Sequence, residues 1–170
     1  MLHLSLLGAT ADRHSFYDYE TFQPLRGHGA RVPFENVNYT QIPTHIKGGS
    51  IIPLRAQSAN TTTELRKNNF RILIAPGLDG TAAGSLYLDD GESLIQDGVT
   101  DITFKYSGDG KFSLDGTFEY DSGVVIESIV LLGQDSARDS MGDGATYDAE
   151  RGTVEWKVEM PLTKGSKMQL

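Results

Sequence analysis

The chain has 170 residues, of which 38% are hydrophobic, and it contains no cysteine. This length suffices for one ordinary domain or two small ones, and the missing cysteines exclude disulfides, thiolate metal sites and cysteine nucleophiles. The 23 acidic and 15 basic residues give a net charge of -8, which repels phosphate backbones and anionic lipid headgroups. No window approaches the ~20 apolar residues of a membrane-spanning helix. We therefore expect neither nucleic acid nor a membrane as a partner.

The N-terminal residues 1–15 give no clear structural element. A short apolar stretch at residues 2–7 precedes Ala9-Thr10-Ala11, a run of small residues that resembles a signal-peptide cleavage site. The stretch lacks a basic n-region and is too short for a signal peptide. We expect an irregular, non-native-like segment here, and no convincing signal peptide.

Short strands are predicted along the rest of the chain, separated by Gly and Asp-Gly turns. Helix-forming residues are confined to Thr63–Lys67, so we expect one turn of helix at most. After residue 98 the pattern is plain alternation, with Ile102, Phe104 and Tyr106 on one face, which predicts a half-buried strand. The predicted strands are residues 50–54, 70–75, 85–88, a hairpin over 101–114, 124–132 and 153–159, with a polar loop over 134–144.

The turn-rich residues 89–98 separate continuous apolar strands from alternating ones, and we expect a domain boundary there. The predicted fold is all-β with almost no helix: two small antiparallel β-sandwich domains in tandem, residues 16–98 and 99–170. Units of this size bury only about 60% of their unfolded surface. Each unit should therefore need contacts with the other unit or with a neighbouring domain to be stable.

Three blocks of sequence are specific enough to indicate a family. They are Tyr17-Asp18-Tyr19-Glu20-Thr21, Ile42-Pro43-Thr44-His45-Ile46-Lys47-Gly48-Gly49-Ser50-Ile51-Ile52-Pro53 and Leu86-Tyr87-Leu88-Asp89-Asp90-Gly91-Glu92-Ser93. In this order and spacing they resemble the region that follows the catalytic barrel in glycoside hydrolase family 31, especially in eukaryotic secreted α-glucosidases. The resemblance covers residues 16–98. The later strands match the distal C-terminal β-domain of that family in length and style.

The resemblance implies a parent enzyme with an N-terminal β-sandwich, a (β/α)₈ barrel, and proximal and distal β-sandwiches, of which this chain holds the last two. The implied parent reaction is retaining hydrolysis of terminal α-linked glucose, which needs two carboxyl groups about 5 Å apart. In the family both lie on the barrel. The nucleophile motif Trp-x-Asp-Met-Asn-Glu is missing here, since the only tryptophan is Trp156 in a predicted strand. We expect no catalytic residue in this chain and no activity from it alone.

The expected partner is the catalytic barrel of the parent, in the same chain or as a separate chain, and α-glucan oligosaccharides are a second candidate. Two alternatives stay open: a freestanding carbohydrate-binding module, and a non-catalytic subunit that pairs with a separate barrel chain. A secreted location is implied for the parent only. The sequons at Asn38 and Asn60 would then be N-glycosylation sites.

The residues of the family blocks are expected to be structural. They are Tyr17, Asp18, Tyr19, Lys47, Gly48, Gly49, Asp89, Asp90 and Gly91. The carboxylates after Leu88 lack the ligand spacing of an EF-hand, so a solvated turn is favoured over a metal site, and no cofactor is expected. His45 is the one candidate for a substrate contact, although a structural histidine is the better interpretation. Tyr17, Tyr19, Phe22 and Phe34 fit burial against a neighbouring domain better than a sugar-stacking platform.

Overall fold

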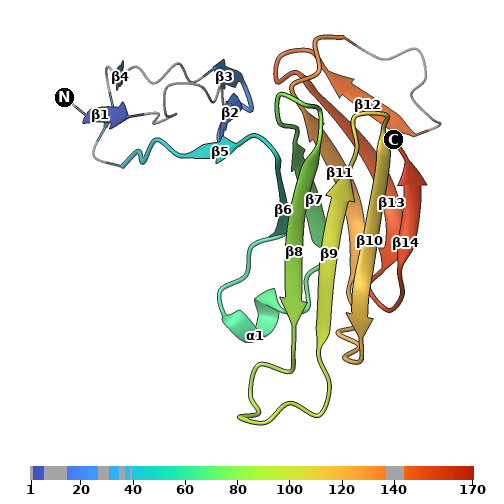
Figure 1. Ribbon diagram of the computed structural model, residues 1–170. Coiled ribbons are helices and arrows are strands. Elements are labelled where there is room, and N and C mark those ends of the chain that lie inside the picture. Colours follow the sequence, from blue (N-terminus) through green and yellow to red (C-terminus); the bar gives the residue numbers. More distant parts are fainter. Residues whose placement is uncertain (1, 6–14, 27–30, 35–36, 39, 137–143) are drawn as a thin grey trace.

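The structure is a computed structural model that describes residues 2–5, 15–26, 31–34, 37–38, 40–136 and 144–170. Most of these residues form a β-sandwich, and a smaller arm of short strands projects from one end of it (Figure 1). The single helix in the described part of the chain, α1 (Thr62–Leu65), is one turn long, so no described helix could cross a membrane.

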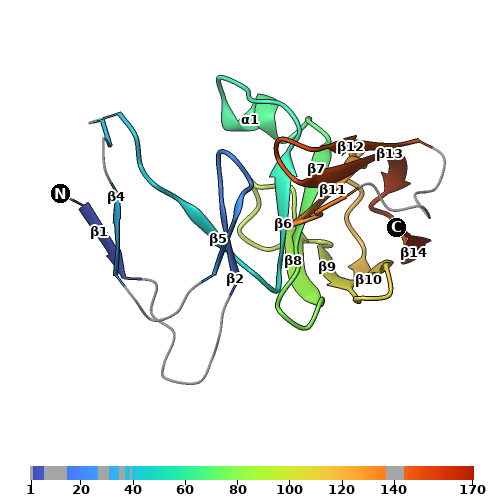
Figure 2. The same cartoon turned by 90° about the horizontal axis from the view of Figure 1, so that it is seen from above.

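Nine strands form one sheet that folds over on itself. They are β6 (Ser50–Arg55), β7 (Phe70–Ala75), β8 (Ala82–Leu88), β9 (Thr100–Tyr106), β10 (Lys111–Phe118), β11 (Val125–Leu132), β12 (Ala145–Asp148), β13 (Thr153–Pro161) and β14 (Ser166–Gln169). The order is β12-β13-β11-β7-β6-β8-β9-β10-β14. Viewed from above, β6, β7, β11, β13 and β12 form one layer, and β8, β9, β10 and β14 form the other (Figure 2).

The two layers join where β6 lies next to β8 in the sheet. This junction has a single registered pair, Ser50 with Ala83, in parallel orientation. The backbones approach closely here, since a Cβ on Gly84 would lie 2.1 Å from the carbonyl oxygen of Ile51. Only glycine allows that approach, because any side chain would force the two strands apart.

The interior between the layers follows from the alternating patterns of the strands. In β9, Ile102, Phe104 and Tyr106 are buried, while the residues between them are exposed. The rings of Phe104 and Phe112 stack with centroids 6.1 Å apart. Trp156 of β13 joins the same core from the other layer. We call this set the sandwich core.

Strands β7 and β11 lie side by side in parallel and are buried on both faces. Ile72 and Ile74 point into the sandwich core, whereas Leu73 and Ala75 point to the outer side of the same layer. There they pack in a second cluster, which we call the junction cluster. Its buried members are Tyr17, Phe22, Ile46, Leu73, Ala75, Val130 and Leu132.

The arm supplies the other half of the junction cluster. A three-stranded sheet of β3 (Pro24–Arg26), β2 (Ser15–Asp18) and β5 (His45–Lys47) covers the outer side of β7 and β11 at one end of the sandwich (Figure 1). Beyond it, β1 (Leu2–Ser5) pairs with β4 (Arg31–Phe34). The side chains of β1 and β4, including Phe34, and residues 6–14 of the expected irregular segment lie outside the described residues.

The prediction of a nearly all-β fold with one helical turn is confirmed. The expected boundary falls in the loop after β8, and β8 and β9 pair across it from Leu88 with Thr100 to Ala82 with Tyr106. The sandwich core also draws residues from both sides of residue 98. The division into units 16–98 and 99–170 stays a prediction.

Candidate functional site at the junction of arm and sandwich

The first two family blocks meet in the three-stranded sheet of the arm. Strands β2 and β5 are antiparallel, with Tyr17 opposite Ile46 and Asp18 opposite His45. After β5 the chain turns through Gly48 and Gly49 directly into β6 of the sandwich. Residues that are about 30 positions apart therefore form one surface where arm and sandwich join.

Tyr17 anchors β2 to the sandwich. Its ring is buried in the junction cluster, and its hydroxyl donates a hydrogen bond of 2.9 Å to the carbonyl oxygen of Pro76, just after β7. The hydroxyl of Ser15 donates to the same oxygen at 3.2 Å. Burial raises the pKa of Tyr17 above its usual value, although the neighbouring Ser15 hydroxyl opposes this. The phenol is thus a neutral, fixed donor that holds two segments together.

Gly48 and Gly49 make the close passage from β5 into β6 possible. A Cβ on Gly48 would lie 1.9 Å from Ser15 Oγ and 2.9 Å from the carbonyl oxygens of Ser15 and Pro76. The amide of Gly48 donates to Ser15 O at 2.7 Å, and that of Gly49 donates to Ala75 O at 2.7 Å. Gly49 has a φ of +88°, a conformation that favours glycine.

Asp18 closes a tight turn at the other end of β2. Its Oδ1 accepts hydrogen bonds from the amides of Glu20 (2.9 Å) and Thr21 (2.8 Å) and from the Thr21 hydroxyl (3.0 Å). Partial burial raises the pKa of Asp18. These hydrogen bonds, with a smaller contribution from the charge of His45, lower the pKa by more than burial raises it, so the net shift is downward. The turn leaves Phe22 with a φ of +61°.

The turn also docks onto the segment between β12 and β13. The guanidinium of Arg151 lies 5.4 Å from the ring centroid of Phe22, and Gln23 Nε2 donates to the carbonyl oxygen of Glu150 at 2.6 Å. A Cβ on Gly133 would lie 2.9 Å from the Tyr17 ring. The arm is therefore fixed to the sandwich by contacts with the loop after β7, with Gly133 after β11 and with the segment between β12 and β13. These contacts hold two parts of the chain together and do not line a pocket.

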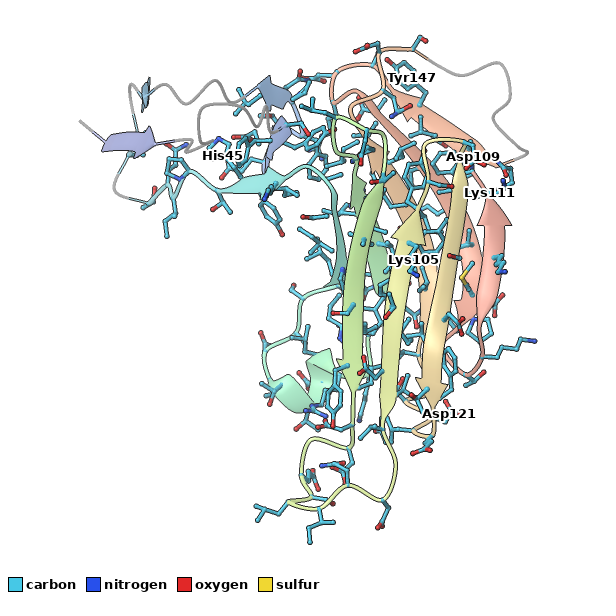
Figure 3. The ribbon with its side chains drawn as sticks, in the orientation of Figure 1. His45, Lys105, Asp109, Lys111, Asp121 and Tyr147 are labelled. Carbon is cyan, nitrogen blue, oxygen red and sulfur yellow. The ribbon has the colours of Figure 1, made fainter. Side chains whose placement is uncertain are left out.

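His45 and Lys47 lie on either side of the buried Ile46 on β5. His45 is partly buried in the arm, beside the strand β2 that carries the anchoring tyrosine (Figure 3). Lys47 is exposed and forms no ion pair with a described residue. Tyr19 is 40% exposed, in contrast to the buried Tyr17 and Phe22. A substrate contact of His45 stays a prediction.

The third family block lies at the opposite end of the sandwich, after β8, next to α1 (Figure 1). Asp90 accepts hydrogen bonds from the Ser93 hydroxyl and from the amides of Glu92 and Ser93, which lower its pKa strongly. Asp89 pairs with Arg66 at 3.5 Å. Within the described residues, no three His, Asp or Glu side chains are grouped to hold a metal ion.

The described residues of the two sequons lie on the surface. Asn60 and Thr62 are exposed, and Thr61 between them caps α1 by accepting a hydrogen bond from the Glu64 amide at 3.2 Å. Asn38 is also exposed, but the residue that follows it lies outside the described residues.

Three cavities border the described residues. Cavities of about 800 and 790 Å³ lie over the face of β9, β10 and β14 that carries Lys105 (Figure 3), and one of about 310 Å³ lies beside α1. The first is lined by no carboxyl side chain, the second by Asp115 and the third by Asp89. None of the three pairs two carboxyl groups, as a retaining glycosidase requires.

Several carboxyl groups in the described part of the chain have a lowered pKa. A general acid in a glycosidase needs a raised pKa. Among the described residues, every carboxyl pKa that departs clearly from its usual value is lowered. At Asp109, for example, hydrogen bonds from Lys111 and Ser107 lower the pKa to about 2. The carboxyl groups with lowered pKa are Asp18, Asp79, Asp90, Asp109 and Glu155.

The chain is similar in sequence to fungal glucosidases. It is 56% identical over 159 residues to the protein described as "Probable alpha/beta-glucosidase agdC" of Aspergillus flavus, and this match covers 91% of the chain and 17% of that relative. For the agdC protein of Neosartorya fischeri the identity is 47% over 155 residues, with 91% and 18% covered. For glucoamylase 1 of Candida albicans it is 36% over 142 residues, with 82% and 15% covered. No family model matches the chain.

Solved structures share the fold. The glucosidase II α subunit, in a DNJ-bound form, gives a TM-score of 0.79 at 17% identity, with 99% of this chain and 21% of that chain covered. A GH31 α-xylosidase from Xanthomonas citri gives 0.56 at 17% identity, with 96% and 18% covered. The chain thus spans less than a fifth of the length of the curated relatives described above. It belongs to glycoside hydrolase family 31 and corresponds to the C-terminal β-domain part of these glucosidases.

Proposed function

We propose that this chain is the bracing β-part of a parent enzyme that hydrolyses terminal α-linked glucose by a retaining route, and that it contributes no catalytic residue itself. The main support is the match of 91% of the chain to about a sixth of a glucosidase that is 56% identical. The cavities described above add to it, since none of them holds the pair of carboxyl groups that this reaction needs. The catalytic barrel would be supplied by the rest of the parent.

The barrel is proposed to contact the arm and the adjoining side of β6. Ile42 is 82% exposed just before β5, and Ile52 and Leu54 on β6 are only partly buried next to the junction cluster. The segment before β5 and the strand β6, which carry these residues, border the angle between arm and sandwich (Figure 1). Apolar side chains grouped in this way favour contact with another protein surface. A neighbouring domain in that angle would hold the arm at a fixed position.

Direct binding of α-glucan oligosaccharides by this chain has weaker support. Sugar rings stack on flat, exposed aromatic side chains. The large exposed aromatic residues of the described chain are Tyr19 in the arm and Tyr87 on β8, which lie at opposite ends of the sandwich. They do not form a strip along one sheet. Secretion of the parent, and glycan attachment at Asn38 and Asn60, stay proposals that follow from the eukaryotic secreted enzymes the sequence resembles.

The activity proposal is tested by incubating the 170-residue chain with maltose and with a chromogenic α-glucoside. We expect no turnover above that of a mock preparation, and turnover that follows the chain through successive columns would contradict the proposal. Calorimetry with maltose and longer α-glucans tests the alternative of a carbohydrate-binding module. Saturable binding with a Kd between micromolar and millimolar would favour that module over a bracing role.

The bracing proposal is tested by expressing the barrel portion of a full-length relative with and without this chain. We expect the two polypeptides to co-purify, and we expect the isolated chain to associate at high concentration through its exposed apolar residues. Light scattering of two variants tests whether the exposed apolar residues cause this association. Ile42→Ser should reduce it, and the matched surface variant Thr117→Ser should not. A monodisperse monomer that does not co-purify with the barrel portion would refute the bracing role.

A further inference from the structure

We infer that the cavity beside α1 binds a small doubly charged oxyanion, a phosphoryl or sulfate group. The cavity has a volume of about 310 Å³, at the lower end of the range for small-molecule sites. It lies between α1, the end of β8 and the segment before β11. Its lining includes Arg55, Arg66, Lys67, Asp89 and Tyr87.

The charge of the lining is opposite to that of the chain. Three cationic side chains and one carboxylate line the cavity, whereas the chain as a whole has a net charge of -8. The one ion pair of the group joins Arg66 and Asp89 at 3.5 Å, and neither Arg55 nor Lys67 forms an ion pair with a described residue. Two positive charges are left without a counter-charge in a confined space. A dianion would neutralise them.

Arg55 is held rigidly at the wall of this cavity. Its Nη1 donates hydrogen bonds to the carbonyl oxygens of Arg66 (3.0 Å) and Asn68 (2.7 Å), and its guanidinium stacks on Phe70 at 4.0 Å from the ring centroid. These contacts leave the other nitrogens of the guanidinium without a hydrogen bond to a described residue. Burial and the charge of Arg66 both lower the pKa of Arg55, as expected for like charges that lie close together. A fixed guanidinium edge is the side chain best suited to an oxyanion.

The family block after β8 holds Arg66 in place. Arg66 Nη1 donates to the carbonyl oxygen of Asp89 at 3.2 Å. A Cβ on Gly91 would lie about 2 Å from three atoms of the Arg66 guanidinium, so a side chain there would displace the guanidinium from this position. Asp90 accepts hydrogen bonds from the amides of Glu92 and Ser93 and so stabilises the turn that contains Asp89 and Gly91. We assign Asp89, Asp90 and Gly91 to the support of this cation.

Hydroxyl groups complete the set of donors around the cavity. Thr63, Tyr87 and Ser122 line it, and their side chains form no hydrogen bond with a described residue. Tetrahedral oxyanions accept several hydrogen bonds at once, and charge-assisted bonds are the stronger ones. Nucleic acid does not fit, because the cavity is small and the chain as a whole has a net charge of -8.

The test uses the 170-residue chain and inorganic phosphate, with sodium chloride of equal ionic strength as the reference. We expect saturable amide shifts in a ¹H–¹⁵N spectrum at residues 55–67, 87–91 and 120–122, with a Kd of about 1 mM. Lys67→Gln and Arg66→Gln should each weaken binding about tenfold. Lys67 has no contact that the fold needs, so its variant separates binding from folding. The matched variant Lys105→Gln, on another face, should leave the Kd unchanged.

Separate titrations with a phosphate monoester and with inorganic sulfate, which both carry two negative charges near neutral pH, distinguish the two sources of the group. Saturable binding of either supports the site. The inference is overturned if phosphate causes no saturable shift at these residues beyond that of chloride. It is also overturned if Lys105→Gln weakens binding as much as Lys67→Gln, since the effect would then come from overall charge.

Discussion

Replacement of Gly48 by alanine is the sharpest perturbation of the junction. The new Cβ would lie 1.9 Å from Ser15 Oγ and 2.9 Å from the carbonyl oxygens of Ser15 and Pro76. The serine hydroxyl can rotate away, but it then loses its hydrogen bond to Pro76 O. The two carbonyl oxygens belong to the backbone of β2 and of the loop after β7. They can move only if arm and sandwich separate slightly.

The size of the effect follows from these contacts. A lost hydrogen bond costs about 1 kcal/mol, and a forced backbone shift in a packed region costs about 1 to 3 kcal/mol. The total of roughly 2 to 4 kcal/mol opposes the attachment of the arm and leaves the sandwich core intact, because Gly48 lies outside that core. The arm should therefore open locally before the sandwich unfolds.

Hydrogen exchange measured by mass spectrometry separates these two events. In Gly48→Ala we expect faster exchange in β2 and β5 and unchanged exchange in β9 and β10. Gly123→Ala is the matched control, since Gly123 also precedes a strand and a Cβ there would meet nothing within 4 Å, at the cost of backbone strain at φ +68°. Adding Ser15→Ala to Gly48→Ala should restore part of the protection. Exchange in β2 and β5 that equals the wild type would refute the steric argument.

Three further changes test the core, the turn and the surface. Phe112→Ala should destabilise the whole sandwich by about 3 to 5 kcal/mol, because the ring is fully buried, and the emission of the buried Trp156 should report one lower melting transition. Asp18→Asn should lower the melting temperature more at pH 7 than at pH 3: the folded-state pKa of Asp18 is lowered, so its contribution is fully present above the unfolded value of about 3.9 and is lost as pH falls through the folded-state pKa. An effect as large at pH 3 as at pH 7 would contradict this. In a secreted full-length parent, Asn60→Gln should remove one glycan, seen as a single mass step, and an unchanged mass would show that the site is not used.

Local pattern was enough to predict the longer strands of the sandwich but not their neighbours, and it gives no prediction of the short strands of the arm or of β12 and β14. The alternation around Ile102, Phe104 and Tyr106 predicts β9 almost to its observed ends. The continuous apolar run of β7 predicts a strand covered on at least one face, and in the structure both faces are buried, since Ile72 and Leu73 have opposite directions. Nothing in the run indicates that β11, more than 50 residues later, is its parallel partner. That pairing depends on how the sheet folds over, which no short window contains.

The sites show the same limit. The family blocks indicate Tyr17, Gly48 and Asp89 as structural positions, but the sequence gives no sign that Tyr17 reaches Pro76 or that Asp89 faces Arg66. Arg55 and Arg66 were not identified as site residues, because each lies in an ordinary polar context and 11 residues separate them. Contacts between chain segments make the cavity, so only the folded chain brings its charges together.

The junction cluster explains how the arm stabilises the sandwich. Alternate residues of β7 and β11 point into the sandwich core and into the junction cluster. Leu73, Val130 and Leu132 would therefore face water if the arm were absent. Burying one such side chain contributes about 1.5 to 3 kcal/mol, and a domain's net stability is only 5 to 15 kcal/mol. The exposure of these three side chains at once would therefore remove a large share of the net stability. In turn, β2 and β5 bury Tyr17 and Ile46 in this cluster against β7 and β11. Arm and sandwich consequently stabilise each other through one small interface, and Tyr17 and Gly48 lie at its centre.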